Sequence, residues 1–269
     1  MYRFRSLHDI DLQQLADCFN LAFSDYEQSI NFTIDSFKYY LTASAVDLSL
    51  SFGAFCNNEL VGFILNSSGI YNNEAVVFDA GTGIVPEHRG KKVFSELFAY
   101  TSKELKNSGI TQYYLEVLQS NQYAVNIYSK KGFVIKREYS VLTASGSKYP
   151  KEDGVEISPY QDFVAFPTEH SVQPSFEHST HTLNQNPQLY EVRYISDLAC
   201  CIYAKRNGAI VQMHYNDINA LKCVISDLVH QYPKLMAKNV DLSATDVIKL
   251  LTDVGFNEIL RQYEMVKAL

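Results

Sequence analysis

The sequence contains little cysteine, no tryptophan and no long apolar run. None of its hydrophobic stretches approaches the roughly 20 residues that a membrane-spanning helix needs. The five cysteines are odd in number and form no C-x-x-C pair, so neither a disulfide framework nor a zinc site is indicated. Residues 1–5 begin a strand-like alternation and lack the apolar core of a signal peptide. We therefore expect a cytoplasmic protein that contacts no membrane and holds no metal.

The composition is that of a globular protein with an acidic balance. Hydrophobic residues make up 46% of the 269 residues and charged residues 20%, which is typical of a soluble domain. A chain of this length forms one large domain or two of ordinary size. The 23 lysines and arginines stand against 30 aspartates and glutamates, a balance that favours a cationic or amine-bearing small molecule over nucleic acid as partner.

The most informative segment runs from residue 81 to residue 133. A strand end, Gly-Thr-Gly-Ile-Val at 81–85, is followed by a proline and then by the turn Arg-Gly-Lys-Lys at 89–92. An amphipathic helix begins directly after this turn. The first amides of a helix have no acceptor within it and carry partial positive charge. The order of strand, turn and helix therefore predicts an anion site at the start of the helix.

Basic residues gather in the same region. Nine of them lie between residues 89 and 137, against three acidic residues, although the whole chain is acidic. Such an excess indicates a small polyanionic ligand rather than a nucleic-acid surface. Taken singly, each lysine is also explained as a solvated residue of a helix face. The nine residues are Arg89, Lys91, Lys92, Lys103, Lys106, Lys130, Lys131, Lys136 and Arg137.

These residues resemble the GNAT acyltransferase superfamily over roughly residues 1–142. Members carry an Arg/Gln-x-x-Gly-x-Gly/Ala loop between the fourth strand and the third helix, and its amides hold the pyrophosphate of acetyl-coenzyme A. Here Arg89 opens the loop, while Lys92 and Phe94 occupy the two glycine positions. Glycine lets a backbone approach phosphate closely, so this departure bears on acyl-CoA binding. A second block has the superfamily's order and spacing: Leu115-Glu116-Val117, Asn121, Ala124, Tyr128 and Gly132-Phe133.

The resemblance implies an acetyl-CoA site. In the superfamily, strands four and five part, and the pantetheine arm lies between them like an additional strand. Ile84 and Val85 would supply backbone hydrogen bonds to this arm, and one of their amides would polarise the thioester carbonyl. Asn121 would bind pantetheine or cap the following helix. The pyrophosphate would be held by the loop residues Arg89, Gly90, Lys91, Lys92, Val93 and Phe94.

Acyl transfer to an amine needs a base for the ammonium proton and an acid for the leaving thiolate. Tyr128 stands where superfamily members keep the general acid, and a phenol pKa of about 10 lies near that of a thiol. Asp79 and Glu116 are the candidate bases, acting directly or through water. Each of the three also has a structural interpretation, Tyr128 as a core tyrosine and the other two as ordinary carboxylates.

Hydrophobic periodicity predicts an α/β fold with a mixed sheet for residues 1–142. The expected order is β-α-α-β-β-β-α-β-α-β, which matches the superfamily's fold. We expect the strands at residues 2–5, 51–56, 60–65, 75–85, 113–118 and 133–142. We expect the helices after residue 9 or 11, after residue 33, from residue 93 to about residue 109, and over residues 121–131.

Residues 143–187 differ in character from what precedes them. Prolines and short polar residues recur here, so we expect a linker or an irregular crossover. His170, His178 and His181 fall in this segment. No cysteine or carboxylate pattern at a metal-ligand spacing accompanies them, so we interpret them as surface loop histidines.

Residues 188–269 are expected to form a second, degenerate GNAT-like domain. Both halves of the chain end with a helix, a Gly-Phe pair at 132–133 or 255–256, and a strand. The whole chain thus resembles tandem GNAT proteins. An α+β domain of unrelated fold is the alternative for this half.

The second half lacks the features that carry the predicted chemistry. No Arg-Gly-Lys loop follows Met213, and Leu251 stands where the first half has Tyr128. We therefore expect this half neither to bind CoA nor to catalyse.

The function implied by the resemblance is N-acyl transfer, with acetyl-CoA as donor and an amine of a small molecule or peptide as acceptor. A homodimer is a possible assembly. The alternative is a non-catalytic protein that binds acyl-CoA as a sensor or scaffold. Lys92 and Phe94 favour this alternative, whereas Asn121, Tyr128 and the basic excess favour the enzyme.

Overall fold

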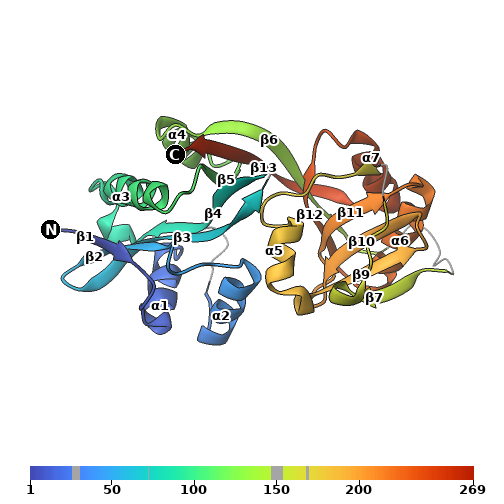
Figure 1. The fold of residues 1–269 in the computed structure, drawn as a ribbon, viewed down its shortest axis with the longest axis horizontal. Coiled ribbons are helices and arrows are strands. Elements are labelled where there is room, and N and C mark those ends of the chain that lie inside the picture. The colour runs from blue at the N-terminus through green and yellow to red at the C-terminus, as the bar shows by residue number, and fades with distance from the viewer. Residues whose placement is uncertain (26–30, 72, 147–153, 168–169) are drawn as a thin grey trace. The chain divides into compact units, whose positions relative to one another are not determined.

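The computed structural model describes residues 1–25, 31–71, 73–146, 154–167 and 170–269 (Figure 1). The chain forms two compact units. The first unit consists of residues 1–115 and 266–269, and the second consists of residues 116–265. Two strands, β5 (Gln112–Leu118) and β13 (Asn257–Ala268), pass from one unit to the other.

The sheet of the first unit has the strand order β1-β2-β3-β4-β5. Its first three strand pairs are antiparallel, and β4 and β5 are parallel. Leu65 pairs with Gly81 and Asn66 with Asp79, so Ala80 is an additional residue that forms a β-bulge in β4. The bounds are β1 Arg3–Ser6, β2 Phe52–Cys56, β3 Glu59–Tyr71 and β4 Glu74–Ile84.

Three α-helices cover this sheet, with α1 and α2 on one face and α3 on the other (Figure 1). They are α1 Leu12–Ala22, α2 Ile34–Ala43 and α3 Val93–Asn107, and a short 3-10 helix, η1 (Pro86–His88), precedes α3. The side chains of Asp11 and Thr33 cap α1 and α2, since each accepts a hydrogen bond from a first-turn amide. Phe19, Phe37 and Phe63 lie in the core beneath these two helices.

The sheet of the second unit has the order β13-β6-β12-β11-β10-β9-β7, and β8 pairs with β11. Its remaining strands are β6 Val134–Ala144, β7 Glu156–Pro159, β8 His170–Ser171, β9 Tyr190–Ile195, β10 Ala199–Ala204, β11 Ile210–Tyr215 and β12 Leu235–Asp241. Its helices are α4 Gln122–Lys130, α5 Thr180–Gln185, α6 Ile218–Gln231 and α7 Thr245–Val254, with 3-10 turns η2 Tyr160–Asp162 and η3 Pro187–Leu189.

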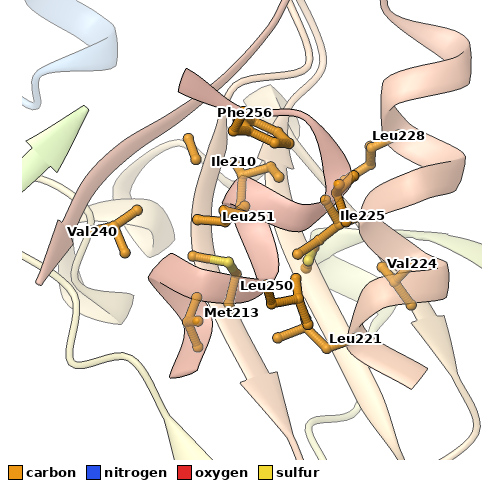
Figure 2. Packing of buried hydrophobic residues seen from close by; sticks show 14 of the residues in the cluster. Ile210, Met213, Leu221, Val224, Ile225, Leu228, Val240, Leu250, Leu251 and Phe256 are labelled. Carbon is orange, nitrogen blue, oxygen red and sulfur yellow. The ribbon is translucent and has the colours of Figure 1, made fainter. Parts of the chain in front are cut away.

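The main core of the second unit lies between its sheet and helices α6 and α7 (Figure 2). Leu221, Ile225 and Leu251 extend from the two helices toward Ile210 and Met213 of β11. A smaller cluster, which includes Leu183 of α5, lies on the other face of β10. Helices with one apolar stripe thus cover both faces of this sheet.

The predicted mixed α/β fold is confirmed, and the strands and helices expected for residues 1–142 are present. The segment 143–187, expected as a linker or crossover, contributes β7, β8, η2 and α5 to the second unit and buries Phe176 and Leu183. The domains 1–142 and 188–269 stay a prediction. The compact units divide after Leu115, and the last residues of β13, 266–269, belong to the first unit. There the Leu269 amide donates to the Thr111 carbonyl at 3.0 Å.

The two Gly-Phe junctions have the same local structure. Gly132 follows α4 with φ 91°, and Gly255 ends α7 with φ 118°. Both values lie in the region that glycine enters without steric cost. The next residues, Phe133 and Phe256, are buried, and a strand follows each. The repeated motif read from the sequence is therefore repeated in the structure.

Candidate functional site

The turn before α3 presents backbone amides that the helix itself does not use. Lys92 is the N-cap residue, and no side chain caps the helix. The Glu96 amide donates to the Lys92 carbonyl at 3.0 Å, which is the first hydrogen bond of the helix. The amides of Val93, Phe94 and Ser95 precede it and have no acceptor within α3. Together with the positive end of the helix dipole, these amides can bind an anion.

The backbone of Lys92 has a conformation that favours glycine. Lys92 has φ 64° and ψ 5°, a left-handed conformation, and Gly90 has φ 70°. A left-handed conformation costs an L-residue about 1–2 kcal/mol, whereas glycine adopts it freely. Lys92 takes this conformation nonetheless, and its side chain is exposed. The lysine therefore adds conformational strain and positive charge without closing the loop.

The side chain of Arg89 is held within the first unit. Its guanidinium forms two hydrogen bonds with the Asp25 carboxylate, at 2.5 and 3.0 Å. It also donates to the carbonyl of Ala22 at 2.7 Å and to that of Ile84 at 2.9 Å. The hydrogen bond from Arg89 lowers the pKa of Asp25. Arg89 thus joins the loop to the end of α1, while Lys91 and Lys92 carry the loop's exposed charge.

Three of the four backbone polar groups of Ile84 and Val85 are used within the first unit. The Val85 amide donates to the Val61 carbonyl at 3.0 Å, and the Val85 carbonyl accepts from the His88 amide at 2.9 Å. The Ile84 carbonyl accepts from Arg89. The hydrogen bonds of an antiparallel ladder alternate in direction, so the Ile84 amide points away from β3.

The ladder between β4 and β5 ends before β4 does. The last residues that pair are Asp79 of β4 and Leu115 of β5, and β4 continues to Ile84. Within the described residues, the part of β4 after Asp79 pairs with β3 only. The Ile84 amide therefore faces the side of β4 on which an extended ligand could add as a strand.

Asp79, one of the two predicted bases, stabilises the bulge in β4. Its Oδ1 accepts from the Gly81 amide at 3.0 Å, and its Oδ2 accepts from the Thr82 hydroxyl at 2.7 Å. The Tyr40 hydroxyl donates to the carbonyl of Ala80, the bulged residue. Both carboxylate oxygens of Asp79 thus have a structural partner.

Glu116, the other predicted base, has a different environment in the second unit. Its Oε2 accepts from Asn239 Nδ2 at 2.6 Å, and Ser175 Oγ lies 3.3 Å from the same nitrogen. Its Oε1 is buried and has no hydrogen-bond partner within the described residues. Burial, and then the charge of Glu177, raise the pKa of Glu116 to about 8. Glu116 is therefore a carboxyl group with one fixed oxygen and one oxygen able to accept a proton.

A bulge in β12 brings Asn239 to Glu116. The ladder of β12 with β6 shifts register between Ala237 and Val240, and Asn239 has φ 51°. Asparagine is among the few residues that tolerate a left-handed conformation. This conformation directs the amide of Asn239 to the carboxylate of Glu116.

Arg137, which the sequence places in the basic excess, is paired inside the second unit. Its Nε and Nη2 each donate to Glu264 at 2.8 Å, and its Nη1 lies 3.4 Å from Asp241 Oδ2. The Tyr139 hydroxyl also donates to Glu264, at 2.7 Å. The Arg137 side chain is only 12% exposed. Arg137 therefore balances buried carboxylates and does not contribute to the exposed positive charge.

Asn121 and Tyr128 both belong to the region of α4 in the second unit. Asn121 Oδ1 accepts from the Ala124 amide at 3.0 Å, so the side chain caps the helix. The side chain of Asn121 thus has the geometry of a helix cap, and its binding of pantetheine stays a prediction. Tyr128 is half-buried, and its ring packs edge-on against Phe133 with centroids 5.5 Å apart.

The cap leads to a test of the role of Asn121. Asn121→Ala is expected to lower the free energy of unfolding by about 1 kcal/mol, while Asn121→Asp retains the accepting oxygen and the stability. Denaturant unfolding of both variants measures this difference. If acetyl-CoA affinity falls in Asn121→Asp while stability is unchanged, the side-chain amide also binds the ligand.

Sequence reasoning did not find the partners of the site residues. Asp25, Tyr40, Ser175 and Asn239 are distant in sequence from the residues they contact, and no motif contains them. The one available signal is the residue type at position 239, because a polar asparagine inside a strand is unusual and tolerates a bulge.

The expectation of a surface histidine is wrong for His178, which is buried at 4% exposure because its segment packs into the second unit. Burial lowers its pKa to about 4, so it is neutral at physiological pH. In the part of the chain that the structure describes, no three His, Cys, Asp or Glu residues lie close enough to hold a metal ion. No helix in the same residues is long and apolar enough to cross a membrane.

A comparison with protein families identifies the first half of the chain. Residues 12–133 match the family described as Acetyltransferase (GNAT) family. The match covers the loop 89–94, both predicted bases and the region of Asn121 and Tyr128. This stretch of the chain is therefore similar to GNAT acetyltransferases. None of the curated proteins matches it in sequence.

Solved structures extend the likeness to the whole chain. A proposed acetyltransferase from Pyrococcus horikoshii is 13% identical, with a TM-score of 0.73 over 100% of this chain and 89% of that one. A GCN5-related N-acetyltransferase from Sphaerobacter thermophilus is 12% identical, with a TM-score of 0.66 over 99% and 95%. A tandem GNAT protein from the clavulanic acid biosynthesis pathway is 10% identical, with a TM-score of 0.61 over 100% and 98%. The chain thus has the fold of a tandem GNAT protein, with two GNAT-like halves.

Proposed function

We propose that the protein is an acyl-CoA-dependent N-acyltransferase that transfers an acetyl group from acetyl-CoA to an amine. The uncapped start of α3 after the left-handed turn at Lys92 is the observation that carries this proposal. It offers the amides of Val93, Phe94 and Ser95 to a diphosphate. The exposed ammonium groups of Lys91 and Lys92 add positive charge beside them.

The end of β4 is the proposed place for the pantetheine arm. The Ile84 amide is the group at positions 84 and 85 that remains for a ligand, since the other three have partners. A hydrogen bond from this amide would polarise the thioester carbonyl and stabilise the charge that develops on it during acyl transfer. The carbonyl of Ile84 becomes a second group that can bind the pantetheine arm if Arg89 releases it.

Glu116 is the better candidate for the base. A base must take up a proton at the pH of the reaction, and a pKa of about 8 suits that role at neutral to mildly alkaline pH. Its free Oε1 can receive the proton from the ammonium, directly or through water. Asp79 has both oxygens engaged in the bulge. Asn239 acts on the reaction through Glu116, whose other oxygen it holds, and is therefore a positioning residue.

Tyr128 is the proposed acid for the leaving thiolate. Its half-buried ring is fixed against Phe133, which limits the positions that its hydroxyl can take. The phenol is protonated at neutral pH and donates its proton to a thiolate of similar basicity.

The second GNAT-like half is proposed not to bind CoA. Its counterpart of α3 is α6, and there the carboxylate of Asp217 caps the helix by accepting from the Asn219 amide at 2.8 Å. A carboxylate already occupies the position at which a phosphate would bind, and it would repel one. We therefore expect one acetyl-CoA per chain.

Charge reversal at the loop tests the proposed phosphate site. In calorimetry at about 0.1 M ionic strength, where the Debye length is about 10 Å, wild type is expected to bind one acetyl-CoA per chain with micromolar-class affinity. Lys92→Glu is expected to weaken binding about tenfold or more, because it replaces an attractive charge with a repulsive one. Lys92→Gly is expected to bind within about threefold of wild type, because glycine keeps the left-handed turn without strain.

The control is Lys106→Glu, an equal change of charge on the last turn of the same helix. Position 106 lies 14 residues from position 92, or about 21 Å along a helix, and its side chain is exposed. Affinity in this control is expected to stay within about twofold of wild type, because charges this far apart are largely screened. Equal losses in both variants would show that net charge, and not this loop, governs binding.

A non-catalytic acyl-CoA-binding protein is the second candidate. The strained turn at Lys92 and the use of the Ile84 carbonyl by Arg89 favour it, since the turn costs free energy to hold and the carbonyl already has a partner. The two functions differ in one measurement. Only the enzyme releases free CoA thiol from acetyl-CoA when a panel of amines is added, whereas both raise their melting temperature with acetyl-CoA.

A further inference from the structure

A cavity of about 600 Å³ lies in the second unit, on the face of β10 and β11 that α6 and α7 do not cover. Its floor consists of four side chains from these two strands. Cys200 pairs with His214, and Ile202 pairs with Gln212, so all four extend from the same face of the sheet. The volume lies within the range of pockets that bind small molecules.

Aromatic rings and one helix form the walls. Tyr160, Phe163 and Phe166 line one side, and Thr180 and Asn184 of α5 line another. The Tyr160 hydroxyl donates to Asn184 Oδ1 at 3.0 Å, which joins the two walls. Because Asn184 Oδ1 accepts this bond, its Nδ2 remains as a hydrogen-bond donor. The cavity thus combines flat apolar surfaces with amide and hydroxyl groups.

The lining residues carry no formal charge. No aspartate, glutamate, lysine or arginine is among the described residues that line the cavity. His214 is the only titratable nitrogen base in the lining, and burial lowers its pKa, so it is neutral at physiological pH. A charged ligand would leave water here without gaining an opposite charge, which costs several kcal/mol.

The hydrogen bonds of Gln212 define which nitrogen of His214 can accept a bond. Gln212 is 3% exposed, and its Nε2 donates to the His178 carbonyl at 2.6 Å. Its Oε1 therefore faces His214 Nε2, 3.1 Å away. Because that oxygen can only accept, His214 Nε2 carries the hydrogen and Nδ1 is an acceptor. The floor of the cavity thus offers one acceptor on a neutral ring.

We propose that this cavity is a second binding site, specific for an uncharged aromatic molecule that carries an amide group. The ring of the ligand packs against the walls of Tyr160, Phe163 and Phe166. Its N–H group donates to His214 Nδ1, and its carbonyl accepts from Asn184 Nδ2 or the Thr180 hydroxyl. The site lies within the second unit and is independent of the proposed acyl transfer.

Three monosubstituted benzenes that differ in charge test this proposal in the full chain. Benzamide is expected to bind at millimolar or tighter Kd in ligand-observed NMR titrations at pH 7.5. Benzoate and benzylamine, which are charged at this pH, are expected to bind about tenfold more weakly or not at all. Asn184→Trp and Thr180→Trp fill the cavity from exposed positions on α5 and are expected to abolish benzamide binding. His214→Phe retains a ring but removes the acceptor, and should weaken benzamide severalfold.

The control is Asn219→Trp on α6, an exposed position that does not line the cavity. Melting temperatures show whether each variant is folded. If one of the two filling variants does not fold, the other still tests the proposal. The proposal is overturned if benzamide shows no saturable binding in wild type. It is equally overturned if a folded filling variant binds benzamide as wild type does, or if benzoate or benzylamine binds as tightly. None of these outcomes bears on the acetyl-CoA site.

Discussion

Glu116→Gln is expected to lower turnover by about 10²-fold or more and, at the same time, to raise the melting temperature at pH 8.5. Turnover falls because glutamine cannot take up the proton of the ammonium. Stability rises because glutamine is uncharged at every pH, whereas the buried carboxyl must ionise in mildly alkaline solution. Glutamine can still accept the hydrogen bond from Asn239, so the local structure is retained.

The pH dependence follows from the raised pKa of Glu116. This pKa rises from 4.5 to about 8 on folding. Below pH 4.5 the group is protonated in both the folded and the unfolded chain, so it adds no pH dependence to the free energy of unfolding. Between pH 4.5 and 8 the unfolded chain loses this proton more readily, so the wild type becomes less stable as pH rises. Glu116→Gln should therefore melt close to wild type at pH 4.5 and several degrees higher at pH 8.5.

Melting curves and pH–rate profiles on the same preparations measure both effects. The wild-type kcat/KM is expected to increase with pH, with an apparent pKa near 8. The Glu116→Gln variant should not show this increase. The titration of the acceptor amine is common to both proteins and cancels in the comparison. Asp79→Asn is the matched change at the other candidate base. A larger loss of turnover in Asp79→Asn than in Glu116→Gln would assign the base to Asp79.

Tyr128→Phe is expected to lower kcat by about 10²-fold or more while leaving acetyl-CoA affinity nearly unchanged. The hydroxyl acts mainly in the transition state, where the thiolate gains its proton, and contributes little to ground-state binding. The packing of the ring against Phe133 is retained, so stability should change little. Measurement of kcat, affinity and melting temperature on one preparation separates these effects, once an amine panel has supplied an acceptor.

Tyr123 offers a control on the same helix. It is 79% exposed, so Tyr123→Phe removes an equal hydroxyl from α4 without touching the core. This variant should keep full turnover. Full turnover in Tyr128→Phe as well would remove Tyr128 from the mechanism, and a lower melting temperature with full turnover would identify it as a structural tyrosine.

The order of helices and strands was predictable because it depends on local signals. Asp11, Thr33 and Asn121 each cap a helix with a side-chain oxygen, and such residues before an apolar stripe mark a helix start in any sequence. The two Gly-Phe pairs mark helix ends in the same way. Glycine at φ 91° and 118° is favoured by backbone sterics alone. These signals need no knowledge of which elements pack together.

The extent of the units was not predictable in this way. Alternating residues identify β13 as a strand, but they do not specify its neighbours. In the structure its last residues belong to the first unit, beside Thr111, although they end the chain. Local patterns therefore could not anticipate that a strand from the end of the sequence returns to the first unit.

The sequence by itself indicated the resemblance to the GNAT superfamily, the loop before α3 and the candidate residues Tyr128, Glu116 and Asp79, because these depend on residue types and spacings within one stretch of chain. Only the tertiary structure decided how these candidates differ. It engages both oxygens of Asp79 in a bulge, joins Arg89 to Asp25, and leaves Glu116 Oε1 buried without a hydrogen-bond partner among the described residues. A pKa, a free hydrogen-bonding group and a cavity depend on contacts between residues far apart in sequence, and such contacts exist only once the chain has folded.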